Sequence, residues 1–193
     1  MTLKTLTLKT VTLLALCTAQ RSQTLAKIKL SKINDNGKEI KIIITDLLKT
    51  SRPGVKNPIL SLPICKERPK LCIYSCIKAY IEKTTSLRTN NQKRLFLSTI
   101  KPFKEVGSQT ISRWIKTTLE MSGIDTTIFS GHSTRAASTS KAFQKGIDLN
   151  IIKETANWSD KSLVFAKYYN KPILSKDDNF ALRIIKNNSS KNK

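Results

Sequence analysis

Apolar residues recur at helical spacing over most of this chain. Between Leu6 and Ala19 their period is closer to that of a helix than to that of a strand. An amphipathic helix is expected from Pro69 to about Thr84, with the proline near its first position. Another is expected to run to about Met121, with Ser108 as its N-cap. Capping residues predict three more helices in the last third of the chain. The first starts near Ser133 or Thr134 and the second at Asp148. The third runs from Ser159 to about Tyr169.

A strand-like pattern interrupts the helices once. The Asn36-Gly37 step is a strong hairpin signal between two segments rich in β-formers. Ile40–Thr45 follows as the second strand and Pro58–Leu62 as the third, with a turn around Lys49–Gly54 between them. The pattern therefore predicts a mainly helical α+β fold, with a small three-stranded antiparallel sheet in the N-terminal third. Lys49 is expected at the tip or shoulder of the second hairpin.

Charge narrows the choice of partner. The 193 residues include 35 Lys and Arg against 13 Asp and Glu, a formal net charge of +22 that is spread along the whole chain. A folded domain with this imbalance usually binds a polyanion, with nucleic acid the first candidate and an anionic membrane surface the second. No apolar run approaches the ~18 residues of a membrane span. Val11–Cys17 is too short for a signal peptide and lacks a cleavage site, so a core helix is expected there.

The four cysteines do not have the spacing of a metal site. Cys72 and Cys76 lie four apart in an apolar helical run, Cys17 lies in another, and Cys65 stands before the first pair. The chain has no CxxC and a single histidine, so a zinc tetrahedron is not indicated. Buried, reduced thiols are the expectation.

The segment Ser130–Lys141, SGHSTRAASTSK, holds the one histidine, His132, with Arg135 three residues later. A helix starting here, capped by Ser133 or Thr134 and ended by Gly146, places both side chains on one face. A helix N-terminus offers unpaired N–H groups, so an added imidazole and guanidinium make a site suited to an anion such as phosphate. Taken alone, the pair is more typical of a helix cap or of a partly exposed surface histidine near a helix start.

Further candidates for phosphate chemistry occur in a fixed order along the chain, namely Arg21, Lys49, His132 with Arg135, Trp158 and the pair Tyr168-Tyr169. This order resembles that of the functional residues in the catalytic domain of the tyrosine recombinase (phage integrase) family. The matching stretches are LLALCTAQRSQTL, KIIITDLLKTSRPG, SGHSTRAASTSKAFQKG and ETANWSDKSLVFAKYYNKPI. The segments HSTRAASTSKAF and NKPI are most similar to recombinases of eukaryotic mobile elements.

The resemblance implies a tyrosine-recombinase catalytic-domain fold and an enzyme that cuts and rejoins DNA through a 3′-phosphotyrosyl intermediate. Two arginines hold the non-bridging phosphate oxygens, a lysine protonates the departing 5′-oxygen, a histidine assists proton transfer, a tryptophan positions the phosphate and a tyrosine attacks. In this sequence those roles fall on Arg21 and Arg135, Lys49, His132, Trp158 and Tyr169.

The resemblance further implies double-stranded DNA as partner, a homo-oligomer on DNA built as a tetrameric synapse, and no membrane or small-molecule partner. No cofactor is implied, because one phosphodiester is exchanged for another ester of similar energy. Residues 1–174 are expected to form the catalytic domain and 175–193 a basic, partly disordered tail. The helical DNA-binding domain that usually precedes the catalytic domain is expected to be absent. The place of action is the nucleus in a eukaryote and otherwise the cytoplasm.

Several alternatives stay open at this point. For the attacking tyrosine, Tyr168 fits the usual spacing from the tryptophan, whereas Tyr169 fits the local pattern aromatic-Tyr-Asn-Lys-Pro. For the hairpin lysine, Lys56 is an alternative to Lys49. Thr24 stands where the family commonly has an acidic residue that supports the first arginine. The chain could also be a catalytically inactive DNA-binding remnant or, less well supported, a topoisomerase-like enzyme with the same chemistry.

Overall fold

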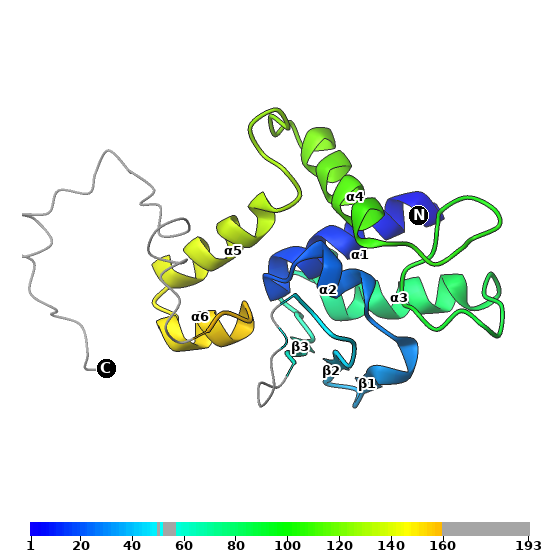
Figure 1. Ribbon diagram of the computed structural model, residues 1–193, viewed down its shortest axis with the longest axis horizontal. Helices are drawn as coiled ribbons and strands as arrows, with labels where there is room; N and C mark the ends of the chain where they lie inside the picture. Colours follow the sequence, from blue (N-terminus) through cyan, green and yellow to red (C-terminus); the bar gives the residue numbers. More distant parts are fainter. Residues whose placement is uncertain (50, 52–56, 160–193) are drawn as a thin grey trace, which may run out of the picture.

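A computed structural model describes residues 1–49, 51 and 57–159 of the chain (Figure 1). The fold is mainly helical with one three-stranded antiparallel sheet, which confirms the predicted class. The helices are α1 (Leu3–Thr18), α2 (Ser22–Ala26), α3 (Ile73–Thr85), α4 (Ser108–Met121), α5 (Ser133–Gln144) and α6 (Leu149–Thr155), with short 3-10 turns at Leu30–Lys32 and Pro69–Leu71. The strands are β1 (Ile33–Asp35), β2 (Glu39–Ile43) and β3 (Ile59–Pro63).

The sheet follows the predicted hairpin signals. Its strand order is β1-β2-β3, and Asn36 and Gly37 turn the chain between β1 and β2, with Gly37 at a φ of +80°. Burial alternates along β2 and β3, so one face of the sheet is apolar and turned inward. On that face Ile40 pairs with Leu62 and Ile42 with Leu60.

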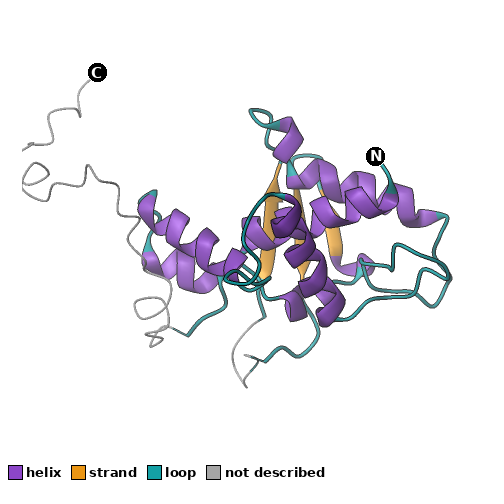
Figure 2. Cartoon of the chain, turned by 90° about the horizontal axis from the view of Figure 1, so that it is seen from above, coloured by secondary structure: helices purple, strands orange, loops and turns teal. Residues whose placement is uncertain are grey.

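One hydrophobic core joins the sheet to the first four helices. Its members come from α1, α2, α3, α4, the inner face of β2 and β3, and the extended segment around Leu95 and Phe96. Figure 2 shows the sheet among the helices, and α5 and α6 lie together at one side of this body in Figure 1. Helix α5 packs on α1, whereas α6 packs on α5 through a small separate cluster around Ile152. The last two helices thus have little apolar attachment to the rest of the described chain.

Three predicted helix starts need correction. Gly107, not Ser108, is the N-cap of α4, and it makes no side-chain capping bond because it has no side chain. Pro69 begins a separate 3-10 turn, since Cys72 is extended and interrupts the chain before α3. For α5 the N-cap is His132. The predicted cap at Asp148 is confirmed, because its carboxylate accepts the N–H of Asn150 at 2.8 Å.

The cysteines follow the expectation only in part. Cys76 is buried on α3, Cys72 is buried at the N-cap of that helix, Cys65 is half-buried, and Cys17 is exposed. The apolar run Val11–Cys17 is longer than one helix face, so its last residues turn outward at the end of α1. The predicted helix from Ser159 through Tyr169 and the tail at 175–193 lie outside the described residues.

Candidate active site

Arg135 lies at the centre of the candidate site. It comes from the first turn of α5, and its side chain is 1% exposed. Nη1 donates to the carbonyl oxygen of Ala19 at 2.6 Å, and Nη2 donates to the carbonyl oxygen of Ala156. The guanidinium therefore joins two parts of the chain that are 116 and 21 residues away from it.

Both acceptors stand at helix C-termini, which explains why a charged group is stable there. Ala19 is the C-cap of α1, with a φ of +51°, and Ala156 is the C-cap of α6. The last carbonyls of a helix have no partner within the helix, and the negative end of the helix dipole points outward from them. Two such ends converge on Arg135, so burial of its charge is offset by charge-assisted hydrogen bonds. A local sequence pattern does not reveal this convergence.

Trp158 covers the same guanidinium. The guanidinium carbon of Arg135 lies 4.7 Å from the centroid of the Trp158 ring, in a cation–π contact. Trp158 is placed by the end of α6, where Asn157 adopts a φ of +51° and the N–H of Trp158 donates to the carbonyl of Lys153 at 2.8 Å. This pair of features is the Schellman ending, in which an αL residue lets the next N–H close back on the helix.

His132 stands at the start of α5 and is exposed, in contrast to Arg135. The pKa of its imidazole is lowered from 6.5, first because neighbouring protein atoms remove part of its hydration and then because Arg135 and Arg21 place positive charge nearby. The single histidine and both candidate arginines are thus within electrostatic reach of one another. Near neutral pH the imidazole is in its neutral form, which can accept a proton.

The local turn before α5 differs from the predicted cap. Ser133 and Thr134 are the first residues of the helix, and their hydroxyls bond locally: the N–H of Ser130 donates to Oγ of Ser133 at 3.0 Å. Thr134 donates from Oγ1 to the carbonyl of Gly131 at 2.9 Å. A closed turn of this kind satisfies the backbone before the helix begins, so neither residue is needed as N-cap.

A close approach between backbones fixes this turn against α4. A Cβ on Gly131 would lie 2.8 Å from the carbonyl oxygen of Ser112 and 2.9 Å from its hydroxyl. Only glycine allows the turn to lie this near α4, so Gly131 helps set where His132 stands.

Arg21 is the N-cap of the short helix α2, directly after the end of α1, and it is half-buried. Its neighbour Gln20 was not singled out from the sequence. The side-chain amide of Gln20 donates to the carbonyl of Thr155 at 2.6 Å, and the side chain is 3% exposed. The only sign of this contact in the sequence is that an amide side chain stands next to a candidate arginine. The carbonyl that the amide binds belongs to a residue 135 positions away.

The matching family model covers nearly all of this chain. Residues 2–173 match the model described as the phage integrase family. The chain belongs to the phage integrase family. The resemblance drawn from the order of the candidate residues is thereby confirmed, whereas the similarity to recombinases of eukaryotic mobile elements stays a prediction.

Solved structures show the same integrase fold. The XerH site-specific recombinase, bound to palindromic difH substrate in a post-cleavage complex, aligns with a TM-score of 0.67 and 17% identity over 95% of this chain and 46% of its own. The XerA recombinase aligns with a TM-score of 0.57 and 20% identity over 89% and 54%. A lambda integrase tetramer bound to a Holliday junction aligns with a TM-score of 0.53 and 19% identity over 82% and 41%.

The integrase-family chain spans about half the length of these solved relatives, between 41% and 54%. At such identities the alignments establish the fold. A comparison with the curated proteins finds no match.

Lys49 of this integrase-family chain lies in the connection between β2 and β3 and is exposed. Hydrogen bonds hold the ends of that connection together. The hydroxyl of Ser51 accepts the N–H of Leu48 and donates to Asn57, and Asn57 donates to the carbonyl of Asp46 at 3.1 Å. Asp46 in turn pairs with Lys29 at 2.5 Å. The pKa of the Asp46 carboxyl is lowered, mainly by the hydrogen bond from Lys29.

The structure brings together Arg135, Trp158, His132 and Arg21 but does not test every candidate. Among the described residues, Lys49 takes part in no ion pair or hydrogen bond with them. Lys56, Tyr168 and Tyr169 lie outside the described residues. The roles expected for the site residues therefore remain proposals.

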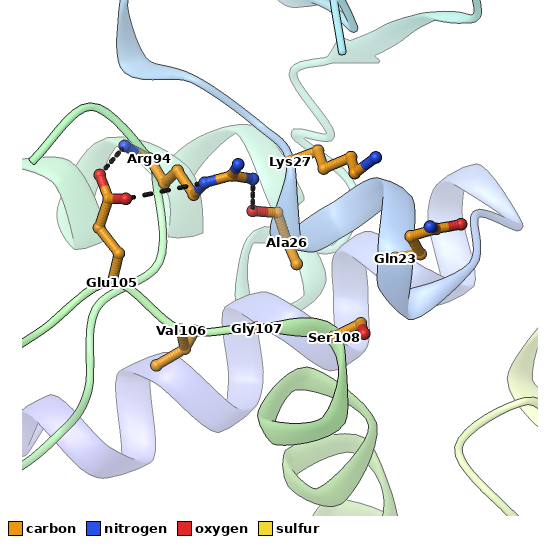
Figure 3. A pocket seen from close by; sticks show the side chains of 8 residues that line it. All are labelled: Gln23, Ala26, Lys27, Arg94, Glu105, Val106, Gly107 and Ser108. Carbon is orange, nitrogen blue, oxygen red and sulfur yellow. Dashed lines mark hydrogen bonds and ion pairs between the residues drawn. The ribbon is translucent and has the colours of Figure 1, made fainter. Parts of the chain in front are cut away.

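An open pocket of about 410 Å³ lies between α2 and the start of α4 (Figure 3). Its lining includes none of the predicted site residues. Arg94 spans it, donating to the carbonyl of Ala26 at 2.8 Å and facing Glu105 at 3.7 Å. Arg94 and Glu105 thus satisfy each other, while Lys27 donates to the carbonyl of Leu47, so these charged groups act as structural bridges.

Two searches for other kinds of site were negative for the described part of the chain. Between residues 1 and 159, leaving out 50 and 52–56, no three His, Cys, Asp or Glu side chains come together as metal ligands would. Within the same ranges no helix is both long and apolar enough to cross a membrane.

Proposed function

We propose that this chain is the catalytic domain of a site-specific DNA recombinase or integrase, which cuts and rejoins DNA through a 3′-phosphotyrosyl intermediate. The observation that carries the proposal is the Arg135 guanidinium, held at two helix ends under Trp158, with Arg21 and His132 within electrostatic reach. Membership of the phage integrase family over residues 2–173 supports the same reaction. Residues 1–174 form the proposed catalytic domain, and 175–193 the proposed basic tail.

Arg21 and Arg135 hold the two non-bridging oxygens of the scissile phosphate in this proposal. The transition state of phosphoryl transfer carries more negative charge on those oxygens than the ground state, so fixed guanidinium donors lower the barrier. In this proposal Arg135 contacts the phosphate while its guanidinium is held by the carbonyls of Ala19 and Ala156. Trp158 keeps the guanidinium plane in place, which supports a positioning role for the indole.

Tyr169 is the proposed nucleophile. Its oxygen forms a bond to phosphorus as the bond to the 5′-oxygen breaks, His132 accepts the phenolic proton, and Lys49 gives a proton to the departing 5′-oxygen. The lowered pKa of His132 supports this role, because a neutral imidazole is needed to accept a proton. Rejoining runs the same steps backwards, with the DNA hydroxyl attacking the phosphotyrosine.

Double-stranded DNA is the proposed substrate, and a homo-oligomer, as a tetrameric synapse, is the proposed assembly. The net charge of +22 supports a polyanionic partner. The XerH complex contains difH substrate, and lambda integrase is a tetramer on a Holliday junction. By extension the protein acts where its DNA is, in the nucleus of a eukaryote or in the cytoplasm otherwise.

Covalent trapping tests the proposal. The full chain is incubated with end-labelled, nicked duplexes of randomised sequence, in which the cut fragment diffuses away and rejoining is prevented. We expect a labelled protein–DNA adduct that survives denaturing electrophoresis, is removed by protease, and is lost in Tyr169→Phe. Tyr168→Phe is the matched control and keeps the adduct. Loss in Tyr168→Phe with retention in Tyr169→Phe would move the nucleophile to Tyr168.

DNA binding is measured on the same duplexes across a salt series. We expect affinity to fall steeply between about 50 and 200 mM salt, because each neutralised phosphate releases counterions. Salt-sensitive binding without any adduct would identify the chain as an inactive DNA-binding remnant. A flat salt response would contradict the nucleic-acid proposal itself.

A further inference from the structure

Gln20 makes an unusual contact for an uncharged residue beside a candidate active site. It follows the end of α1, and its side chain is 3% exposed. Its Nε2 donates to the carbonyl of Thr155, in the last turn of α6, at 2.6 Å, and to the carbonyl of Thr18, in the last turn of α1, at 3.3 Å. One amide group thus links the C-terminal ends of two helices.

This link runs beside the one made by Arg135. The guanidinium binds the carbonyls of Ala19 and Ala156. The Gln20 amide binds the carbonyls of Thr18 and Thr155, which stand one residue earlier at the same two helix ends. Both donors satisfy carbonyls that the helices leave without a partner. The amide of Gln20 does so without adding charge to the site.

Helix α6 depends on these links because its apolar attachment is small. Ile152 is the one buried hydrophobic residue of the cluster that joins α6 to α5, with Ala136, Ala142, Leu149 and Trp158 partly buried around it. Helix α6 has only two turns, so the position of its C-terminal end decides where Trp158 lies over Arg135. At the other end of the link, Gln20 immediately precedes Arg21 in the chain.

We propose that Gln20 is a positioning residue for DNA strand cleavage: its amide fixes the end of α6 against the end of α1, and thereby sets the positions of Arg21, the next residue in the chain, and of Trp158, which covers Arg135. This inference rests on the proposed function for its chemical consequence. The physical tie itself can be tested without any chemistry. A misplacement of about 1 Å at a reacting centre costs about 100-fold in rate, so loss of the amide is expected to act on the chemical step.

The variant Gln20→Leu keeps the side chain's approximate volume and removes its donors. In single-turnover cleavage of the nicked duplexes at saturating protein, we expect the rate constant of adduct formation to fall about 10- to 100-fold. The fraction of protein that finally forms adduct, and the DNA concentration at half saturation, stay as in the wild type. A purely structural role would instead lower that fraction and leave the rate constant of the folded molecules unchanged, which would overturn the proposal.

Gln92→Leu is the matched control. Gln92 also donates its amide to a distant main-chain carbonyl, that of Phe103 at 2.9 Å, in a loop that contains none of the site residues. The same substitution there removes the same kind of bond, and we expect the wild-type rate constant. An equal fall in both variants would show that any lost amide bond slows the reaction, and the specific role of Gln20 would be wrong.

Hydrogen exchange tests the link between the ends of α1 and α6 without requiring DNA cleavage. We expect the amides of α6 to exchange about tenfold faster in Gln20→Leu than in the wild type or Gln92→Leu, since local opening reports the loss of a tertiary tie. Unchanged exchange in α6 would refute the tie whatever the cleavage assay shows. If the wild type forms no adduct while α6 loses protection in Gln20→Leu, the proposed function fails and the tie between the two helix ends stands.

Discussion

Arg135 and Trp158 form a cation–π pair in which the guanidinium carbon lies 4.7 Å from the centre of the indole ring. The charge in this pair is buried, and its hydrogen bonds go to the ends of two helices. A residue expected from the sequence to face a phosphate is thus also a structural clamp. Substitutions at this position should accordingly affect folding and chemistry together.

Arg135→Lys tests the clamp. A lysine keeps the charge but has a single nitrogen, so it cannot bridge the carbonyls of Ala19 and Ala156 as the planar fork does. We expect the free energy of unfolding to fall by about 1–3 kcal/mol, the usual cost of one buried polar group without a partner. We expect the rate of adduct formation to fall about 10²–10³-fold.

Chemical denaturation and single-turnover cleavage measure these two effects. Arg113→Lys is the control for the same change at an exposed position of α4, and we expect it to keep wild-type stability. A stable Arg135→Lys variant with the wild-type denaturation midpoint would show that the two carbonyl bonds contribute nothing to stability.

His132 should make stability depend on pH in a defined window. The folded-state pKa is lowered from 6.5, so the unfolded chain binds more protons between the folded-state value and about 6.5. The free energy of unfolding therefore rises with pH through that window and is reduced below it. His132→Asn should flatten this dependence.

Because the chain has one histidine, its titration can be followed by NMR without assignment of other rings. We expect a midpoint below 6.5 in the folded protein, and a midpoint that moves upward in Arg21→Gln, since one nearby positive charge is removed. A midpoint at or above 6.5 in the wild type would contradict the predicted neutral base.

Gly131→Ala tests the close approach to α4. The new Cβ would lie 2.8 Å from the backbone carbonyl of Ser112, so the turn before α5 has to move. We expect a loss of about 1–3 kcal/mol in the free energy of unfolding, together with slower cleavage because His132 follows directly. A Gly131→Ala variant with the stability of the wild type would show that the contact with Ser112 imposes no constraint.

Substitutions of Asn157 test whether the C-terminal turn of α6 places Trp158. Asn157 has a φ of +51°, a left-handed conformation that costs Ala more free energy than it costs Asn. We expect Asn157→Ala to lower the free energy of unfolding by about 1–2 kcal/mol and to slow cleavage, whereas Asn157→Gly keeps the rate. Thermal unfolding and the trapping assay give the two readouts. Better cleavage in Asn157→Ala than in Asn157→Gly would rule out this role for the αL turn.

Much of the fold was predictable because its signals are local. The hairpin at Asn36-Gly37, the cap at Asp148 and the helix-ending glycine Gly146, at a φ of +78°, each depend on a few adjacent residues. The starts of α4 and α5 were wrong by one or two residues because a glycine and a closed turn replaced the expected serine and threonine caps. The exposure of Cys17 was missed since a continuous apolar run does not reveal which of its residues leave the core.

By itself the sequence determined the helical class, the small sheet and the resemblance to the phage integrase family, and the family match then confirmed that resemblance. Only the tertiary structure decided that Arg135 is buried between the ends of α1 and α6, and that Gln20 makes a parallel link beside it. The physical reason is distance along the chain. These bonds join backbone carbonyls to side chains up to 135 residues away, and a carbonyl oxygen is the same in every residue, so no sequence pattern marks it as a partner.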